Sequence, residues 1–102
     1  MTRGRFITVE GTEGCGKSTN LAFIRDWLIQ RDLSVLQTRE PGGTPLAEEV
    51  RELLLKTREE KVDRQTELLL IYAARAQHLR ERVEPALASG QWVLCDRFTD
   101  ST

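Results

Sequence analysis

A parallel α/β sheet flanked by helices is the fold class that the sequence predicts. Three short apolar segments, at residues 6–9, 34–38 and 92–95, are rich in β-branched or aromatic residues and are typical of buried strands. Segments with apolar residues at helical spacing lie between them. Strands that alternate with helices favour parallel pairing, and such sheets bind ligands at the carboxyl ends of their strands.

The first strand stops at a glycine-rich loop, after which an amphipathic helix of about four turns is expected. Its buried face is indicated by Leu21, Ile24 and Leu28, and polar residues 30–32 end it. The second strand runs into residues 39–45, which contain the densest cluster of loop-forming residues in the chain.

A second helix follows, with its apolar face at Leu46, Val50, Leu53 and Leu54. The charged residues 56–64 lack periodicity and are expected to form a solvated loop. From Thr66 onward a long helix carries an apolar stripe until Pro85 interrupts or restarts it, and Gly90 ends it. The members of that stripe are Leu69, Tyr72, Ala73, Ala76, Leu79 and Val83.

Composition and charge restrict the class of protein. The 102 residues suffice for one domain or part of one, and no linker or repeat marks a boundary. A net charge of −1 gives no basic excess for nucleic acid or anionic lipid, and two cysteines are too few for a disulfide framework. No apolar run approaches a membrane span or signal peptide, so we expect a cytoplasmic protein without nucleic-acid or membrane partners.

The chain stops a few residues after its third strand, where a parallel sheet calls for further elements. We therefore expect residues 1–102 to be the amino-terminal part of a single domain that is truncated after the third strand.

The loop after the first strand matches the phosphate-binding motif GxxxxGK(S/T) and precedes a helix, as that motif requires. Its backbone N–H groups and the helix N-terminus form a nest for phosphate, Lys17 reaches the β- and γ-phosphates, and Ser18 offers its hydroxyl to Mg²⁺. The chain is thus predicted to be a P-loop protein that binds a nucleoside triphosphate. Its predicted contacts are Gly11, Thr12, Glu13, Gly14, Cys15, Gly16, Lys17, Ser18 and Thr19.

Several charged residues are candidates for further roles. Glu13, beside the bound phosphates, either faces a substrate hydroxyl or is a solvated acid. Asp96 and Arg97 follow the third strand, where Asp96 is expected to support Mg²⁺ and Arg97 to hold phosphate or stabilise a transferred phosphoryl group; a structural ion pair is the alternative. Arg39, Arg51 and Arg75 are further anion-binding candidates. His78, the only histidine, receives no role.

Four segments together resemble bacterial thymidylate kinase, over essentially the whole chain as the amino-terminal half of such a protein. They are EGTEGCGKST at residues 10–19, TREPGGTPLAEEVR at 38–51, YAARAQHL at 72–79 and PALASGQWVLCDRFTDS at 85–101. The resemblance implies an adenylate-kinase-like P-loop NTPase fold, ATP and Mg²⁺ as cofactors, and phosphorylation of dTMP to dTDP for dTTP biosynthesis. It also implies a homodimer.

Carried over by position, Glu13 resembles the carboxylate near the sugar 3′-hydroxyl, and Arg75 the arginine that binds the thymine base. Arg51 and Arg97 match arginines near the acceptor phosphate, and Glu40 belongs to the loop that borders the monophosphate. A further substrate contact, Ile71, occupies a position where many relatives place a phenylalanine that stacks on thymine.

The P-loop has no arginine, so the chain resembles the subgroup that supplies this charge from a lid, which lies beyond Thr102 in the family. Loss of such an arginine slows transfer roughly 10³- to 10⁵-fold, so residues 1–102 alone are expected to be nearly inactive. Three other classes remain as alternatives. They are a P-loop phosphotransferase with a different acceptor, a non-catalytic nucleotide switch, and a DNA-binding or scaffold protein.

Overall fold

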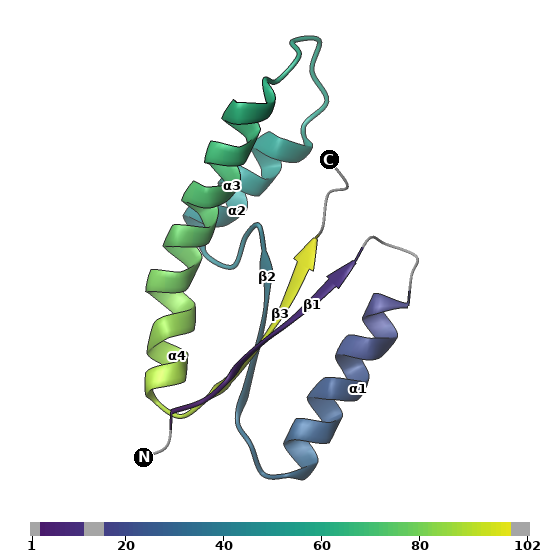
Figure 1. Ribbon diagram of the computed structural model, residues 1–102, viewed down its shortest axis with the longest axis vertical. Helices are drawn as coiled ribbons and strands as arrows, with labels where there is room; N and C mark the ends of the chain where they lie inside the picture. Colours follow the sequence, from purple (N-terminus) through teal and green to yellow (C-terminus); the bar gives the residue numbers. More distant parts are fainter. Residues whose placement is uncertain (1–2, 12–15, 99–102) are drawn as a thin grey trace.

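The computed structural model describes residues 3–11 and 16–98, and this part of the chain contains one parallel sheet. Its strands are β1 (Phe6–Gly11), β2 (Val35–Glu40) and β3 (Trp92–Phe98), in the order β1-β3-β2 (Figure 1). The last strand in the sequence therefore lies in the middle and pairs with both others. The predicted fold class, a parallel α/β sheet flanked by helices, is confirmed.

Two strands are longer than their apolar patterns indicate. β2 includes Arg39 and Glu40, which the sequence places in the following loop, and β3 includes Asp96 and Arg97, which the sequence places after the strand. The register continues through these residues, with Arg39 opposite Asp96 and Glu40 opposite Arg97. Backbone pairing with a neighbour extends these strands, and side-chain hydrophobicity does not report on that pairing.

Helices connect the strands. α1 (Lys17–Gln30) lies between β1 and β2, and α2 (Pro45–Leu55) and α3 (Arg64–His78) follow β2. A π-helical turn, η1 (Leu79–Val83), and α4 (Glu84–Ala88) continue α3 toward β3. Pro85 lies in the first turn of α4, where a missing N–H is tolerated, so the proline restarts the helix.

The two faces of the sheet are covered by different helices. On one face Phe6, Leu36 and Val93 pack against Val83 and Leu87 from the η1–α4 segment. On the other face lies α1, in which Leu21 and Leu28 are buried as predicted. Figure 1 shows α1 on one side of the strands and the α3–α4 segment on the other.

The apolar stripe predicted from Leu69 to Val83 divides in the structure: Leu79 and Val83 of η1 pack at the sheet, whereas its members in the first turns of α3 do not. Leu69 and Tyr72 are 66% and 58% exposed, whereas Ala74 and His78 are buried. The helix turns a partly polar face toward the sheet, because His78 and Arg75 both contact the carboxylate of Glu40 there. No helix among the described residues has the length and apolarity that a membrane span requires.

Candidate active site

The glycine motif connects β1 to α1 as the sequence predicts. β1 ends at Gly11, and α1 begins at Lys17 with Ser18 and Thr19 in its first turn. Gly16 precedes the helix with a φ of 80°, a left-handed conformation that glycine adopts without a steric penalty. Four predicted contacts lie outside the described residues, and their roles stay predictions: Thr12, Glu13, Gly14 and Cys15.

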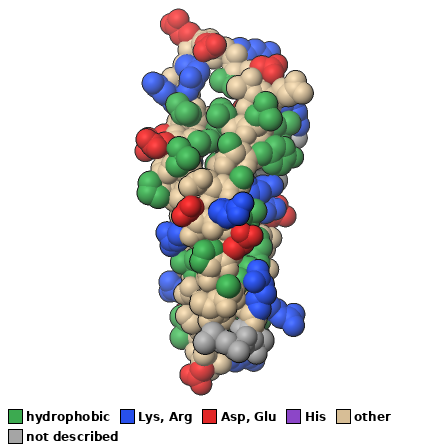
Figure 2. Space-filling model, turned by 90° about the vertical axis from the view of Figure 1, so that its left-hand side faces the viewer, with side chains coloured by type: hydrophobic (Ala, Val, Ile, Leu, Met, Phe, Trp, Pro, Cys, Tyr) green, Lys and Arg blue, Asp and Glu red, His purple; other side chains and the backbone are tan. Residues whose placement is uncertain are grey.

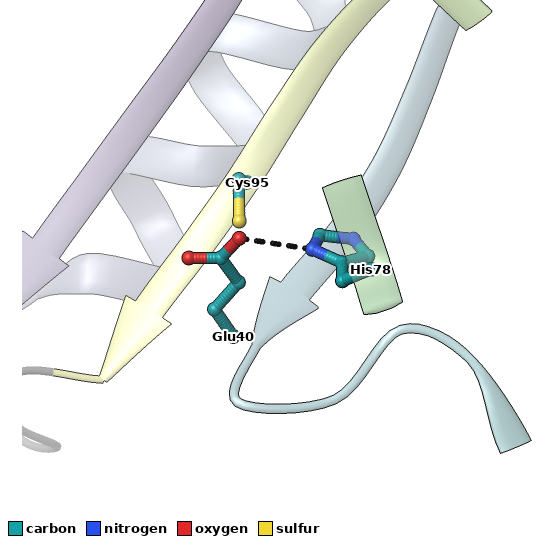
Figure 3. Close-up of side chains that lie close together, drawn as sticks. All are labelled: Glu40, His78 and Cys95. Carbon is teal, nitrogen blue, oxygen red and sulfur yellow. Dashed lines mark hydrogen bonds and ion pairs between the residues drawn. The ribbon is translucent and has the colours of Figure 1, made fainter. Parts of the chain in front are cut away.

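A buried carboxylate, Glu40, organises the carboxyl edge of the sheet. It is the last residue of β2, and its side chain is only 3% exposed. Oε1 of Glu40 accepts a hydrogen bond from Nε of Arg75 at 3.1 Å and pairs with Nη2 of Arg97 at 3.3 Å. Oε2 lies 2.9 Å from Nδ1 of His78 (Figure 3). Arg75 and Arg97, which the sequence analysis names as site residues, and His78, to which it gives no role, thus all contact one carboxylate.

The surroundings of Glu40 favour its ionised form. Burial raises the pKa of Glu40, but the hydrogen bond from His78 and the charges of Arg75 and Arg97 together lower that pKa below its usual value. Glu40 is therefore a carboxylate near neutral pH that accepts hydrogen bonds from Arg75 and His78 and forms an ion pair with Arg97.

Arg97 bridges the two outer strands. In the register it lies between Glu10 of β1 and Glu40 of β2, and its Nη1 is 3.6 Å from Oε1 of Glu10. Its Nε is buried, and within the described residues no hydrogen-bond partner for that atom is found. The ion pair that the sequence left open as an alternative role for Arg97 is thus present. Such a pair also holds the guanidinium in place at the edge where ligands bind.

Asp96 lies on the opposite face of the sheet from Arg97, because successive side chains of a strand alternate. Its strand neighbour Leu94 is paired with Gln37, which accepts a hydrogen bond at 3.5 Å from Arg25 of α1. Asp96 therefore lies on the face of the sheet that α1 covers. This helix begins at the glycine motif. It also lines a cavity of about 650 Å³ beside β2.

α3 places Ile71 one turn before Arg75, on the same side of the helix. Ile71 is half-buried, and its neighbour Tyr72 is exposed. The Arg75 guanidinium lies 5.8 Å from the centre of the Tyr72 ring. Arg75 and Ile71, the two residues that the resemblance assigns to the base, thus lie on the same side of α3, and Arg75 reaches the sheet edge through Glu40.

The loop between β2 and α2 is fixed by charged side chains. Arg51 donates from Nη1 to the carbonyl oxygen of Pro41 at 2.9 Å. Arg39 makes a two-point contact with Glu48, which also accepts from the N–H of Gly43 at 2.8 Å. The guanidinium of Arg39 is therefore paired with Glu48. The guanidinium of Arg51 lies against the backbone of the loop at Pro41.

Glu40, His78 and Cys95 offer three kinds of metal ligand, all within 4.8 Å of one another (Figure 3). Two arginines already neutralise Glu40, and their charge repels a cation. Burial raises the pKa of the Cys95 thiol to about 12, so the thiolate that a metal needs is disfavoured. The cluster is suited to a hydrogen-bond network rather than to a metal ion.

Sequence reasoning missed Thr38, Glu48 and His78. His78 is fully buried, with Nδ1 on Glu40 and Nε2 2.8 Å from Oγ1 of Thr38. Its position three residues after Arg75, on the same helical face, was the available signal. No comparable pattern marks Glu48, because its partner comes from another element.

Comparisons with known proteins agree with this arrangement. A family model described as thymidylate kinase matches residues 9–102. Thymidylate kinase from Teredinibacter turnerae is 73% identical over 99 residues, which cover 97% of this chain and 48% of that protein. The corresponding protein from Chromohalobacter salexigens is 64% identical over 103 residues, covering 100% of this chain and 49% of that protein.

The crystal structure of thymidylate kinase from Ehrlichia chaffeensis is similar in fold, with a TM-score of 0.79 and 40% identity over 93% of this chain and 55% of that one. The chain spans about half the length of the curated relatives it matches. Since the family model covers nearly all of the sequence, this chain belongs to the thymidylate kinase family.

Proposed function

We propose that the protein containing this chain transfers the γ-phosphoryl group of ATP to dTMP, with Mg²⁺, and so makes dTDP for dTTP synthesis. The observation that carries the proposal is the buried Glu40, which holds Arg75 and Arg97 together at the sheet edge beside the glycine motif. The names of the relatives support dTMP as the acceptor.

On the α1 side, the backbone of the glycine motif and the helix N-terminus hold the triphosphate. In this proposal Lys17 acts on the β- and γ-phosphates, while Ser18 and Asp96 hold Mg²⁺ directly or through water. A bound Mg²⁺ neutralises phosphate charge and orders the oxygens for in-line transfer. The placement of Asp96 on the face that α1 covers supports this assignment.

On the α3 side, the proposal places dTMP. Arg75 hydrogen-bonds the thymine base, Ile71 covers it by apolar contact, and Arg51 and Arg97 hold the phosphate. Glu40 is the acceptor that positions Arg75 and Arg97. Glu13 is assigned to the sugar hydroxyl by resemblance.

The division of Asp96 and Arg97 between the two faces supports this scheme. In this proposal Asp96 acts on the ATP side and Arg97 on the dTMP side. Because both belong to β3, the strand fixes the position of the phosphoryl donor relative to the phosphoryl acceptor. Arg97, beside the transferred group, stabilises the charge that develops there.

A cytoplasmic homodimer is part of the proposal. The exposed apolar side chains of α2 and α3 support it, and Figure 2 shows apolar side chains gathered on that side of the molecule. They are Leu46, Leu53, Leu55, Leu69 and Tyr72. We expect sedimentation equilibrium of the full-length protein to give a dimer and Leu69→Lys to weaken it; a monomeric wild type would contradict the assembly.

Calorimetry tests the acceptor. A full-length protein carrying this sequence is titrated with the monophosphates of thymidine, uridine, cytidine and guanosine, in the presence of Mg²⁺ and a non-hydrolysable ATP analogue. We expect selective binding of dTMP, weakened tenfold or more by Arg75→Ala, which corresponds to at least about 1.4 kcal/mol. Arg80→Ala, at an exposed position of η1, is the control.

The outcomes separate the alternatives. Equal or absent binding of all four monophosphates contradicts the dTMP proposal. Binding of the triphosphate analogue without any monophosphate favours a nucleotide switch, and selective binding of another monophosphate favours a different phosphotransferase.

A further inference from the structure

We propose that His78, held by Thr38, is a positioning residue that orients Glu40 and, through it, the two arginines of the acceptor site. The inference rests on the proposed function, since Arg75 and Arg97 are assigned to dTMP there. Neither His78 nor Thr38 touches the ligand in this scheme.

The contacts form one continuous chain. Oγ1 of Thr38 lies 2.8 Å from Nε2 of His78, and Nδ1 of His78 lies 2.9 Å from Oε2 of Glu40. The other oxygen of Glu40 holds Nε of Arg75 at 3.1 Å and Nη2 of Arg97 at 3.3 Å. A strand residue thus reaches both arginines through one imidazole and one carboxylate.

The charge of Glu40 determines the direction of these hydrogen bonds. An ionised carboxylate only accepts, so Nδ1 of His78 carries a proton and donates a hydrogen bond to Glu40. In the neutral imidazole Nε2 then accepts from the hydroxyl of Thr38, which selects one tautomer. His78 is 0% exposed and Glu40 3% exposed, so water does not compete for these bonds.

The ring is also confined sterically. Gly43 lies so close that a Cβ atom there would be 2.2 Å from Cδ2 of His78 and 2.8 Å from Oγ1 of Thr38. The loop backbone therefore limits rotation of the imidazole. Hydrogen bonds at both ring nitrogens and this close approach together leave His78 one orientation, and so leave Glu40 one orientation.

A fixed Glu40 matters because one carboxylate oxygen serves two arginines. Its contact with Arg75 uses Nε, so Glu40 does not engage the two terminal amino groups of that guanidinium. Rotation of the carboxylate would move Arg75 and Arg97 together. Loss of His78 or Thr38 should therefore weaken dTMP binding without weakening the binding of the triphosphate.

Two matched pairs of variants in the full-length protein test this. Thr38→Val removes the hydroxyl and keeps the shape, whereas Thr38→Ser keeps the hydroxyl. His78→Asn keeps an amide donor near the position of Nδ1, whereas His78→Gln places its amide near Nε2. Calorimetry with dTMP and with the ATP analogue, KM and kcat for both substrates, and thermal unfolding are measured for each.

We expect Thr38→Val and His78→Gln to raise Kd and KM for dTMP about tenfold, with KM for ATP unchanged. Thr38→Ser and His78→Asn should stay closer to the wild type. Normal dTMP binding by Thr38→Val and His78→Gln would overturn the inference. An equal loss of affinity for both substrates together with a lower Tm would overturn it too, because that is the signature of a purely structural role.

The proposed function fails separately. Wild-type protein that binds no dTMP contradicts the function itself, whereas wild-type binding that all four variants retain contradicts only the positioning role.

Discussion

At the scale of single residues, Asp96 and Arg97 are neighbours in β3 that lie on opposite faces of the sheet. Their positions in the sequence suggest one cluster, but alternation along β3 places them on opposite faces. Arg97 lies with Glu10 and Glu40, and Asp96 lies on the face of α1. Replacement of Arg97 and replacement of Asp96 should therefore impair different properties of the protein.

We expect Arg97→Lys to weaken dTMP binding about tenfold, because lysine cannot reproduce the planar two-sided contact. Asp96→Asn should leave dTMP binding unchanged and raise the Mg²⁺ concentration needed for half-maximal rate. Calorimetry and Mg²⁺ titration of the initial rate measure the two effects. Loss of dTMP binding in Asp96→Asn would show that the faces do not act separately.

Glu48 makes stability depend on pH. The hydrogen bond from Arg39, opposed by burial and supported by the N–H of Gly43, lowers the pKa of Glu48 to about 2 from a usual value of 4.5. A carboxyl group with a lowered pKa stabilises the fold above its unfolded pKa, and this contribution is lost as pH falls through the folded value.

Glu48→Gln should therefore reduce the free energy of unfolding at pH 7, by no more than about 1 kcal/mol because the Arg39–Glu48 pair is largely exposed. The difference from the wild type should shrink as pH falls from about 4.5 toward 2. Urea unfolding at pH 7 and pH 3 measures it. A difference that is the same at both pH values would contradict the role of the ionised pair.

At the scale of elements, periodicity predicts where helices occur better than which way they face. Leu21 and Leu28 of α1 are buried as their spacing indicates, and α1 contacts the three strands of the sheet. Of the apolar stripe predicted from Leu69 to Val83, the members Leu69 and Tyr72 in α3 are exposed, and the buried side of α3 contains His78. The continuation of the stripe in η1, at Val83, is buried in the core. A polar residue inside a core is invisible to a hydrophobic pattern when its partners come from distant elements, as Thr38 and Glu40 do.

The site follows the same division. The glycine motif is local in sequence, so its place between β1 and α1 could be predicted. The pairing of Glu40 with Arg75, 35 residues away, depends on how α3 packs on the sheet. Local patterns do not encode such a contact, and only the family resemblance brought these two residues into one site.

The loop before α2 is expected to be intolerant of even a methyl group at Gly43. Its φ of 96° is strained for other residues, and an added Cβ would collide with His78 and Thr38. Gly16 has a φ of 80° but open space around it. Gly43→Ala should lower the free energy of unfolding by about 2–4 kcal/mol, and Gly16→Ala by about 1 kcal/mol.

Chemical denaturation of the full-length variants measures both changes, and dTMP affinity should fall only for Gly43→Ala. Similar stability losses at the two glycines would mean that the collision at His78 is relieved by movement of the loop.

At the scale of the whole molecule, the described part leaves apolar surface uncovered on α1. Phe23, Trp27 and Ile29 are 68%, 43% and 53% exposed. Relatives about twice as long have further residues that can cover such surface. A peptide of residues 1–102 alone should therefore bind a hydrophobic dye such as ANS and self-associate more than the full-length protein does.

Dye fluorescence and sedimentation velocity, with both proteins at equal concentration, measure this. A monomeric, dye-silent 102-residue peptide with cooperative unfolding would contradict it and would show an autonomous folding unit.

The strand order β1-β3-β2 has a consequence for how the chain is made. β1 and β2 do not pair with each other. Each pairs with β3, which is the last of the three strands to be synthesised. Translation proceeds at about 5–20 residues per second, so two unpaired strand segments persist for seconds before their partner exists. Until then Glu40 has no Arg97, and a nascent chain that is stalled before residue 92 should recruit chaperones rather than nucleotide.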